Sequence, residues 1–321
     1  MRFDERLLDC IVFIGRDDSG KFVSHGTGFL AAKGTGGYFF QHIVTAGHVI
    51  RGIEHHEVCV RINQLDGTVS HEHWPKNGWE FHPDKAVDLA VAPASVPKDE
   101  FSIGHVHLDK HVLTPDAIKE HRIGVGDDVV TAGMFTRHIH YTINRPIVRA
   151  GIISAMADAP VETSRGFVHA YLVEVRSIAG LSGSPVFVQM APVRIVPDDS
   201  GGGSVVATRG HFWYFMGVML GHHVTSDPNE VVSPDPYLPA DMNAGLGVVV
   251  PWERLMELVE IPKLRRQREK IVAKKREEAK FVEDTATGAE PPTTVGSPSH
   301  KEDFNRLLTS VTTGKPRDDQ T

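Results

Sequence analysis

The stretch Gly180-Leu181-Ser182-Gly183-Ser184-Pro185 decides how this sequence is interpreted. Its first serine has glycine two residues before it and directly after it, an arrangement that neither Ser177 nor Ser184 has. Glycine at these places permits a sharp backbone turn that a side chain would block. A Gly-Ser turn alone is more often only a turn, so the interpretation depends on partner segments elsewhere in the chain.

Two partner segments precede the serine. Val44-Thr45-Ala46-Gly47-His48 lies upstream, and Val87-Asp88-Leu89-Ala90-Val91 lies between it and the serine. A serine hydroxyl needs a base to take its proton, and a buried carboxylate can hold a histidine in that role. His, Asp, Ser is one of three chain orders known for such triads. We therefore predict Ser182 as the nucleophile, His48 as general base and acid, and Asp88 as the orienting carboxylate.

The same stretch predicts where an oxyanion would be held. The backbone N–H groups of Gly180 and Ser182 are predicted to point together at the developing negative charge. An α/β-hydrolase elbow does not fit, because it needs glycine where Ser184 stands and a histidine after the serine, whereas His48 precedes it. Asp84 remains an alternative to the predicted carboxylate.

Composition and charge limit the class of protein. The 321 residues are 40% hydrophobic, which is enough for one large or two small cores. Residues 263–281 carry nine Lys or Arg and three Glu, so the rest of the chain has a net charge of −13 against −7 for the whole. An acidic body does not indicate nucleic-acid binding, and no apolar run approaches the ~20 residues of a membrane span.

Cysteine content and the N-terminal residues bear on location. The only cysteines are Cys10 and Cys59, whereas secreted proteases of small-barrel type usually carry several disulfides. We interpret the two as buried thiols, with one pairing as the alternative. The first six residues, Met1 to Arg6, include the acids Asp4 and Glu5 where a signal peptide needs an apolar core. These features predict a cytoplasmic protein.

Short apolar runs separated by Gly, Pro and Asp favour strands over long helices. We predict an all-β fold of two six-stranded antiparallel β-barrels, followed by a helix and a disordered tail. The predicted ranges are a peptidase-like domain over 1–258, with barrel 1 at about 8–110, barrel 2 at about 122–251 and a C-terminal helix at 252–259, then a charged helical extension at 263–281 and the tail at 282–321. The extension is interpreted as a solvated helix, with binding to an acidic partner, an anionic membrane surface or nucleic acid as the alternative.

Several segments, in order, resemble the trypsin-like two-barrel serine peptidases, closest to the high-temperature-requirement (Deg-type) branch. The likeness covers roughly residues 8–258. Besides the three segments quoted above, it includes Gly26-Thr27-Gly28-Phe29, Gly126-Asp127-Asp128-Val129-Val130, Ala150-Gly151-Ile152-Ile153-Ser154, Met216-Gly217-Val218-Met219 and Gly245-Leu246-Gly247-Val248-Val249-Val250-Pro251. The resemblance implies two barrels with the site in the cleft between them. It also implies peptide-bond hydrolysis through an acyl-enzyme, without a metal or organic cofactor.

The resemblance also implies a substrate-binding region. Its residues are Arg176, Ala179, Leu220, Gly221 and His222, of which Arg176 and His222 would favour an acidic side chain before the cut bond. The alternative is that Arg176 points to solvent and His222 only caps a strand. The chain departs from the family in three ways: Ser184 stands where glycine is common, Leu181 where a polar residue is common, and no PDZ domain fits after residue 258.

Two histidine pairs have a spacing that can bind zinc. They are in His71-Glu72-His73 and His138-Ile139-His140, but neither has a third ligand in register, so we predict no metal site. Two functional classes remain. The first is a serine endopeptidase acting on a protein or peptide substrate, and the alternative is a protease-fold binding or sensing module with latent or no turnover. The sequence does not indicate an oligomeric state.

Overall fold

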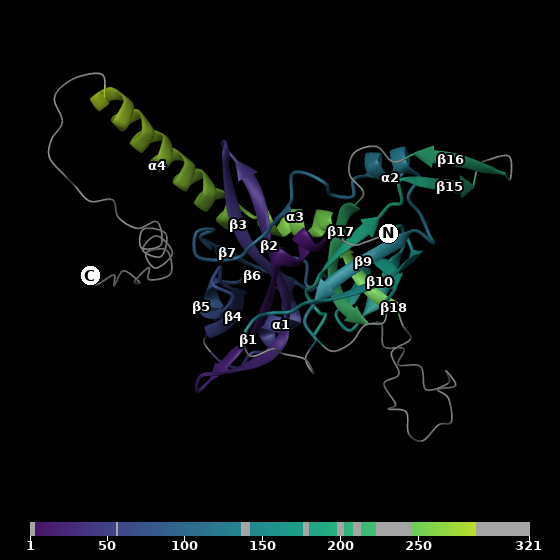
Figure 1. The fold of residues 1–321 in the computed structure, drawn as a ribbon, viewed down its shortest axis with the longest axis horizontal. Helices are drawn as coiled ribbons and strands as arrows, with labels where there is room; N and C mark the ends of the chain where they lie inside the picture. The colour runs from purple at the N-terminus through teal and green to yellow at the C-terminus, as the bar shows by residue number, and fades with distance from the viewer. Residues whose placement is uncertain are drawn as a thin grey trace, which may run out of the picture.

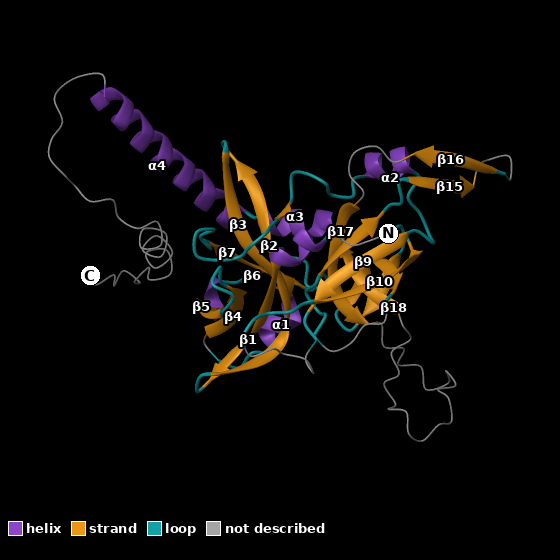
Figure 2. Cartoon of the chain, viewed as in Figure 1, coloured by secondary structure: helices purple, strands orange, loops and turns teal. Residues whose placement is uncertain are grey.

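The computed structural model describes residues 4–55, 57–135, 142–175, 180–197, 202–207, 213–222 and 246–286. Over these residues the protein is mostly β, and it has two halves that lie side by side (Figures 1 and 2). The half that comes first in the chain, which contains β1 to β8, is called the front half and is drawn in purple to blue in Figure 1. The half that contains β9 to β18 is called the rear half and is drawn in teal to green. The two halves meet along an apolar interface, which positions the candidate site.

The front half is an eight-stranded sheet with the order β5-β4-β1-β2-β3-β7-β6, and β8 pairs in parallel with β2. Its strands are β1 (Ile11–Asp18), β2 (Lys21–Thr35), β3 (Tyr38–Ala46), β4 (Glu57–Asn63), β5 (Val69–Pro75), β6 (Glu80–Phe81), β7 (Leu89–Ala94) and β8 (Val106–His107). A 3₁₀ helix, η1 (Glu5–Cys10), precedes them.

The sequence predicts a six-stranded first barrel, and the observed sheet differs from it. Within the described residues, no pairing joins the end strands β5 and β6. Between them, β5 ends at Pro75 and the 3₁₀ turn η2 (Lys76–Gly78) follows at once. A closed first barrel is therefore not shown, and the two-barrel architecture remains a prediction.

The rear half is a closed six-stranded barrel with the order β10-β13-β18-β17-β14-β9, as predicted for this part of the chain. Its strands are β9 (Asp128–Gly133), β10 (Ile147–Ala155), β13 (Tyr171–Glu174), β14 (Pro185–Gln189), β17 (Trp213–His222) and β18 (Leu246–Pro251). Two hairpins are inserted, one of β11 (Pro160–Thr163) with β12 (Gly166–His169) and one of β15 (Val193–Pro197) with β16 (Gly203–Ala207). The helix α2 (Pro115–His121) connects the halves and is capped by the Thr114 side chain.

Strand β1 shows why the core lies in layers. Its first residues are buried on both faces, as expected for a strand whose side chains alternate between two apolar environments. Val12 and Ile14 point into the interior of the front half, whereas Ile11 and Phe13 join the cluster between the halves. In that shared cluster the centre of the Phe29 ring lies 5.6 Å from the centre of the Phe215 ring, which belongs to the rear barrel. The halves are thus held together by packing.

Two helices follow the rear barrel. Helix α3 (Trp252–Val259) covers the range predicted for the C-terminal helix, and its buried face joins the cluster between the halves. Helix α4 (Pro262–Ala286) extends away from the body (Figure 1). Residues 282–286, predicted as tail, belong to this helix, although Val282, Asp284 and Thr285 are not strong helix formers. The remaining tail, 287–321, lies outside the described residues, and no helix within the described residues is long and apolar enough to cross a membrane.

One buried arginine attaches α4 to the body. Arg268 is 3% exposed and donates to the Val259 carbonyl, to Glu260 and to the Thr35 hydroxyl at 2.7, 2.7 and 3.2 Å. Replacing it with alanine should lower the free energy of unfolding by about 1.5–3 kcal/mol, the usual loss for hydrogen bonds to a charged group. Urea denaturation measures this. Arg265→Ala, which removes an exposed ion pair on the same helix, is the matched control and should change stability by less than about 1 kcal/mol.

Candidate active site

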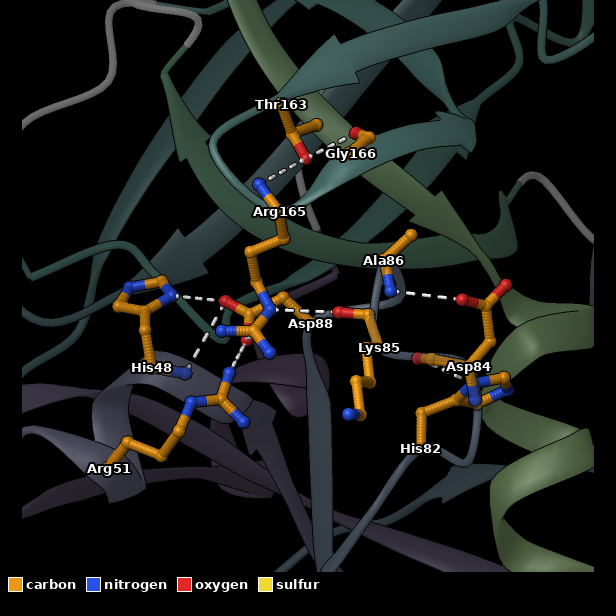
Figure 3. Close-up of polar contacts among 10 residues, drawn as sticks. All are labelled: His48, Arg51, His82, Asp84, Lys85, Ala86, Asp88, Thr163, Arg165 and Gly166. Atoms are coloured by element: carbon orange, nitrogen blue, oxygen red, sulfur yellow. Dashed lines mark hydrogen bonds and ion pairs between the residues drawn. The ribbon is translucent and has the colours of Figure 1, made fainter.

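His48 and Asp88 are brought together where one strand of the front half ends and another begins. Strand β3 runs out at Ala46 into the short helix α1 (Gly47–Arg51), while Asp88 stands immediately before β7. The imidazole Nδ1 lies 2.6 Å from Asp88 Oδ2, and the backbone N–H of His48 lies 3.3 Å from the same oxygen (Figure 3). Because a carboxylate only accepts, Nδ1–H is the donor, and Nε2 is left as the basic nitrogen.

The Asp88 side chain is buried, and the His48 side chain is partly exposed to solvent. The Asp88 side chain is 7% exposed, whereas that of His48 is 48% exposed. Gly47 allows this close packing, since a Cβ there would lie 2.7 Å from Asp88 Oδ1. Its N–H donates to the Asp88 carbonyl at 2.8 Å and joins the two segments. A buried carboxylate thus holds an accessible imidazole by one ring nitrogen, which is the arrangement needed to orient a general base.

Asp84, the alternative carboxylate, has another role. Its Oδ1 accepts from the Ala86 N–H at 2.9 Å, and its own N–H donates to His82 Nδ1 at 3.1 Å (Figure 3). These contacts close the turn that leads to Asp88. No contact between Asp84 and His48 occurs among the described residues, so the structure pairs His48 with Asp88.

The loop carrying Ser182 docks on Thr27 of β2, which pairs with the β3 strand that leads to His48. Thr27 N–H donates to the Ser182 carbonyl at 2.9 Å, and the Thr27 hydroxyl donates to the Gly180 carbonyl at 2.5 Å. Thr45, three residues before His48, donates its hydroxyl to the Thr27 carbonyl at 2.7 Å. The three predicted segments therefore meet. Within the described contacts, no hydrogen bond joins Ser182 Oγ to the imidazole.

Gly183 has a backbone conformation and a contact that require glycine. Its φ is +87°, and a Cβ would lie 2.1 Å from the Thr27 carbonyl oxygen and 2.3 Å from Thr45 Oγ1. Left-handed strain costs about 1–3 kcal/mol, and overpacking adds about as much.

We therefore expect Gly183→Ala to lower the free energy of unfolding by about 2 kcal/mol or more. Gly37→Ala is the matched control, because Gly37 has a φ of +92° with nothing near its Cβ position. The control should show only the strain, and urea denaturation of both variants gives the difference. Equal losses for the two variants would show that the contact with Thr27 is not required.

The rear barrel supplies the other side of the Ser182 loop. Gly183 N–H donates to the Met219 carbonyl at 2.7 Å, and Met219 N–H donates to the Ser184 carbonyl at 2.9 Å. These bonds fix the loop to β17. The Ser184 side chain is fully buried and leaves its hydroxyl without a hydrogen-bond partner within the described residues.

The structure describes only part of the predicted substrate-binding region. A Cβ on Gly221 would lie 3.5 Å from Ser182 Oγ, so this residue is beside the predicted nucleophile. Leu220 is half-buried against the apolar clusters, and His222 ends β17, where its backbone pairs with Gly247. Arg176 and Ala179 lie outside the described residues. The roles of all five residues remain predictions.

Sequence reasoning missed two arginines beside Asp88. Arg51 Nη2 donates to Asp88 Oδ1, and Arg165 Nε lies 3.6 Å from the same oxygen. Arg51 is three residues after His48, so helical spacing could have placed it on the same face of α1. Arg165 comes from the turn between β11 and β12, and no local pattern links that turn to Asp88. Figure 3 shows both guanidinium groups approaching the carboxylate.

The surroundings lower the pKa of His48 below its usual value. The largest cause is desolvation, and the positive charges of Arg51 and Arg165 act in the same direction. The imidazole consequently stays neutral to a lower pH than a free histidine does. A neutral imidazole is the form that can accept a proton from a nucleophile.

The other candidate side chains form no metal centre in the part of the chain that the structure describes. His71 Nδ1 lies 3.7 Å from Asp17 Oδ2, and His73 Nδ1 lies 3.6 Å from Glu57 Oε2, so the two histidines have separate partners. The pair His138 and His140 lies outside the described residues. Cys10 and Cys59 are free buried thiols, and burial raises the pKa of Cys59 to about 12. A thiol with so high a pKa is a poor nucleophile.

No family model matches this chain, and no similar curated protein is found. Among solved structures it is similar to the crystal structure of the MamO protease domain from Magnetospirillum magneticum in its apo form. The two share 14% sequence identity over 63% of this chain and 93% of that chain, with a TM-score of 0.40. Membership of the Deg-type branch remains a prediction.

Proposed function

We propose that this protein is a serine endopeptidase with Ser182 as nucleophile, His48 as general base and acid, and Asp88 as the orienting carboxylate. The observation that carries the proposal is the 2.6 Å contact of His48 Nδ1 with a buried Asp88, beside the docked Ser182 loop. In this arrangement Nε2 is free to take the serine proton.

The proposed reaction has two stages. Ser182 Oγ attacks the peptide carbonyl carbon as its proton passes to His48 Nε2, and the imidazolium then protonates the leaving amine. Water, deprotonated by the same nitrogen, attacks the acyl-enzyme; the bond from the acyl carbon to Ser182 Oγ breaks, and the imidazolium returns the proton to that oxygen as the second product leaves. Asp88 stabilises the imidazolium in both stages without taking its proton.

The backbone amides of Gly180 and Ser182 are proposed to hold the oxyanion. The φ of Gly180 is +105°, a conformation that favours glycine and that turns successive amides out of regular structure. Within the described residues neither amide donates to a protein acceptor. Loss of one such donor typically lowers turnover by about 10²–10³-fold.

The substrate is proposed to be a protein or peptide that passes beside β17. Gly221, next to the Ser182 hydroxyl, belongs to the end of that strand, together with Leu220 and His222. Arg176 and Ala179 are proposed to complete the pocket for the side chain before the cut bond. The free thiols of Cys10 and Cys59 support the proposal of a cytoplasmic location.

Labelling with a biotinylated fluorophosphonate tests the proposal, because this probe reacts only with an activated serine. We expect one labelled site in the full chain, mapped to Ser182 by mass spectrometry of the peptides, and loss of the label in Ser182→Ala and His48→Ala. Ser184→Ala is the matched control and should keep the label, since its hydroxyl is fully buried. A folded chain that shows no label, while trypsin labels in parallel, would favour the binding or sensing module without turnover.

A further inference from the structure

Asp88 has its two carboxylate oxygens assigned to different partners. Oδ2 faces His48, at 2.6 Å from Nδ1 and 3.3 Å from the backbone nitrogen. Oδ1 faces the guanidinium groups of Arg51 and Arg165. With both oxygens occupied from different directions, the carboxylate cannot rotate without breaking contacts on both sides (Figure 3). The orientation of the imidazole therefore depends on what holds Oδ1.

The two arginines reach Oδ1 from different parts of the fold. Arg51 belongs to α1, the helix that carries His48, and its guanidinium lies 5.0 Å from the centre of the Phe81 ring. Arg165 belongs to the inserted hairpin of the rear half, between β11 and β12. One contact is local, whereas the other crosses from the rear half to the front half.

The hairpin turn is built to present Arg165. The Thr163 hydroxyl accepts from the Arg165 backbone N–H at 3.2 Å and donates to the Gly166 carbonyl at 2.8 Å. Arg165 Nε also donates to the Lys85 carbonyl at 2.9 Å, in the turn that leads to Asp88. The side chain is therefore fixed at its base by the hairpin and at its end by the front half (Figure 3).

We propose that Arg165 is a positioning residue for the His48–Asp88 pair, holding Asp88 Oδ1 from the rear half of the molecule so that Oδ2 stays directed at His48. The pair is then complete only when the β11–β12 hairpin is docked on the turn at Lys85. The kinetic part of this inference rests on the proposed peptidase function.

The charges around His48 predict the direction in which its pKa changes when Arg165 is removed. Within the described residues, the charged groups that face His48 are Asp88, Arg51 and Arg165. Two guanidinium groups against one carboxylate leave an excess positive charge, which opposes a further proton on the imidazole. Removing Arg165 should therefore raise the pKa of His48, and the acid limb of the pH–rate profile should move to higher pH.

The experiment compares Arg165→Ala, Arg165→Lys and the control Arg265→Ala in the full chain. For Arg165→Ala we expect kcat/KM on fluorescently labelled casein to fall by about 10-fold to 10²-fold, the effect of a misplaced catalytic group. Its acid limb should lie at higher pH than in the wild type. Arg165→Lys should return the acid limb toward the wild-type position, because it restores the charge. Arg265→Ala should match the wild type.

A second measurement keeps the inference testable without turnover. NMR titration of ¹⁵N-labelled histidine follows the imidazole of His48, assigned by its absence in His48→Ala. The midpoint should rise in Arg165→Ala and return toward the wild type in Arg165→Lys. If the wild type hydrolyses nothing but the midpoint moves as stated, the peptidase proposal fails and the positioning role stands. An unchanged midpoint and an unchanged kcat/KM in Arg165→Ala would overturn the inference.

Discussion

Replacing Ser182 or His48 with alanine is expected to lower kcat on labelled casein by about 10⁶-fold, the effect of removing one member of a serine–histidine pair that acts as a unit. Without the hydroxyl no acyl-enzyme can form, and without the imidazole nothing takes the serine proton. KM should change little, because neither side chain is proposed to hold the substrate in the ground state. Steady-state kinetics on the purified full chain measure both quantities.

The double variant sharpens this prediction. Ser182→Ala with His48→Ala should be no slower than either single variant, since each change already removes the same proton-transfer step. Ser184→Ala should keep wild-type kcat and show that the loss is specific to Ser182. Losses that multiply in the double variant would mean that the two side chains act independently, contrary to the proposed mechanism.

Asp88→Asn is expected to lower kcat by about 10⁴-fold, the size of the effect when an orienting carboxylate becomes an amide. The neighbouring groups in this fold explain why. Arg51 and Arg165 only donate, so they should draw the amide oxygen to their side and turn the NH₂ toward His48. His48 Nδ1 must then accept, which places the ring proton on Nε2, where it blocks general-base action.

Asp84→Asn is the matched control for this change. It alters a carboxylate in the same turn that contacts Ala86 rather than His48, so kcat should stay near the wild-type value. Far-UV circular dichroism and thermal unfolding of both variants separate a loss of activity from a loss of structure. A nearly normal rate for Asp88→Asn, with a crippled Asp84→Asn, would move the orienting role to Asp84.

The rear half of the fold follows from local patterns that the sequence shows directly. Alternating and continuous apolar runs predict strands in this region, and the structure closes six of them into a barrel. Pro251-Trp252 marks the start of a helix, and α3 begins there. In the front half the same patterns predict strands, but the closed barrel predicted there is not shown. Whether end strands pair depends on contacts between segments far apart in the chain, which a local pattern does not encode.

The candidate site divides in the same way. The glycines around Ser182 are recognisable in the sequence because the turn itself requires them, as the φ of Gly183 and its contact with Thr27 show. The pairing of His48 with Asp88 rather than Asp84 could not be predicted from such a local pattern. Both carboxylates stand close together in the sequence, and only the direction of the chain entering β7 decides which of them meets the imidazole.

Three reactive groups of the candidate site could be predicted from sequence: a serine in a turn flanked by glycines, a histidine at the end of an apolar strand and an acid at the start of another. These features depend on residue type and short-range spacing, so they can be recognised without knowledge of the fold. The charged groups around Asp88, by contrast, became visible only in the folded molecule. Arg165 reaches Asp88 from another half of the molecule, and a contact between distant segments arises only when strand pairing and core packing bring them together.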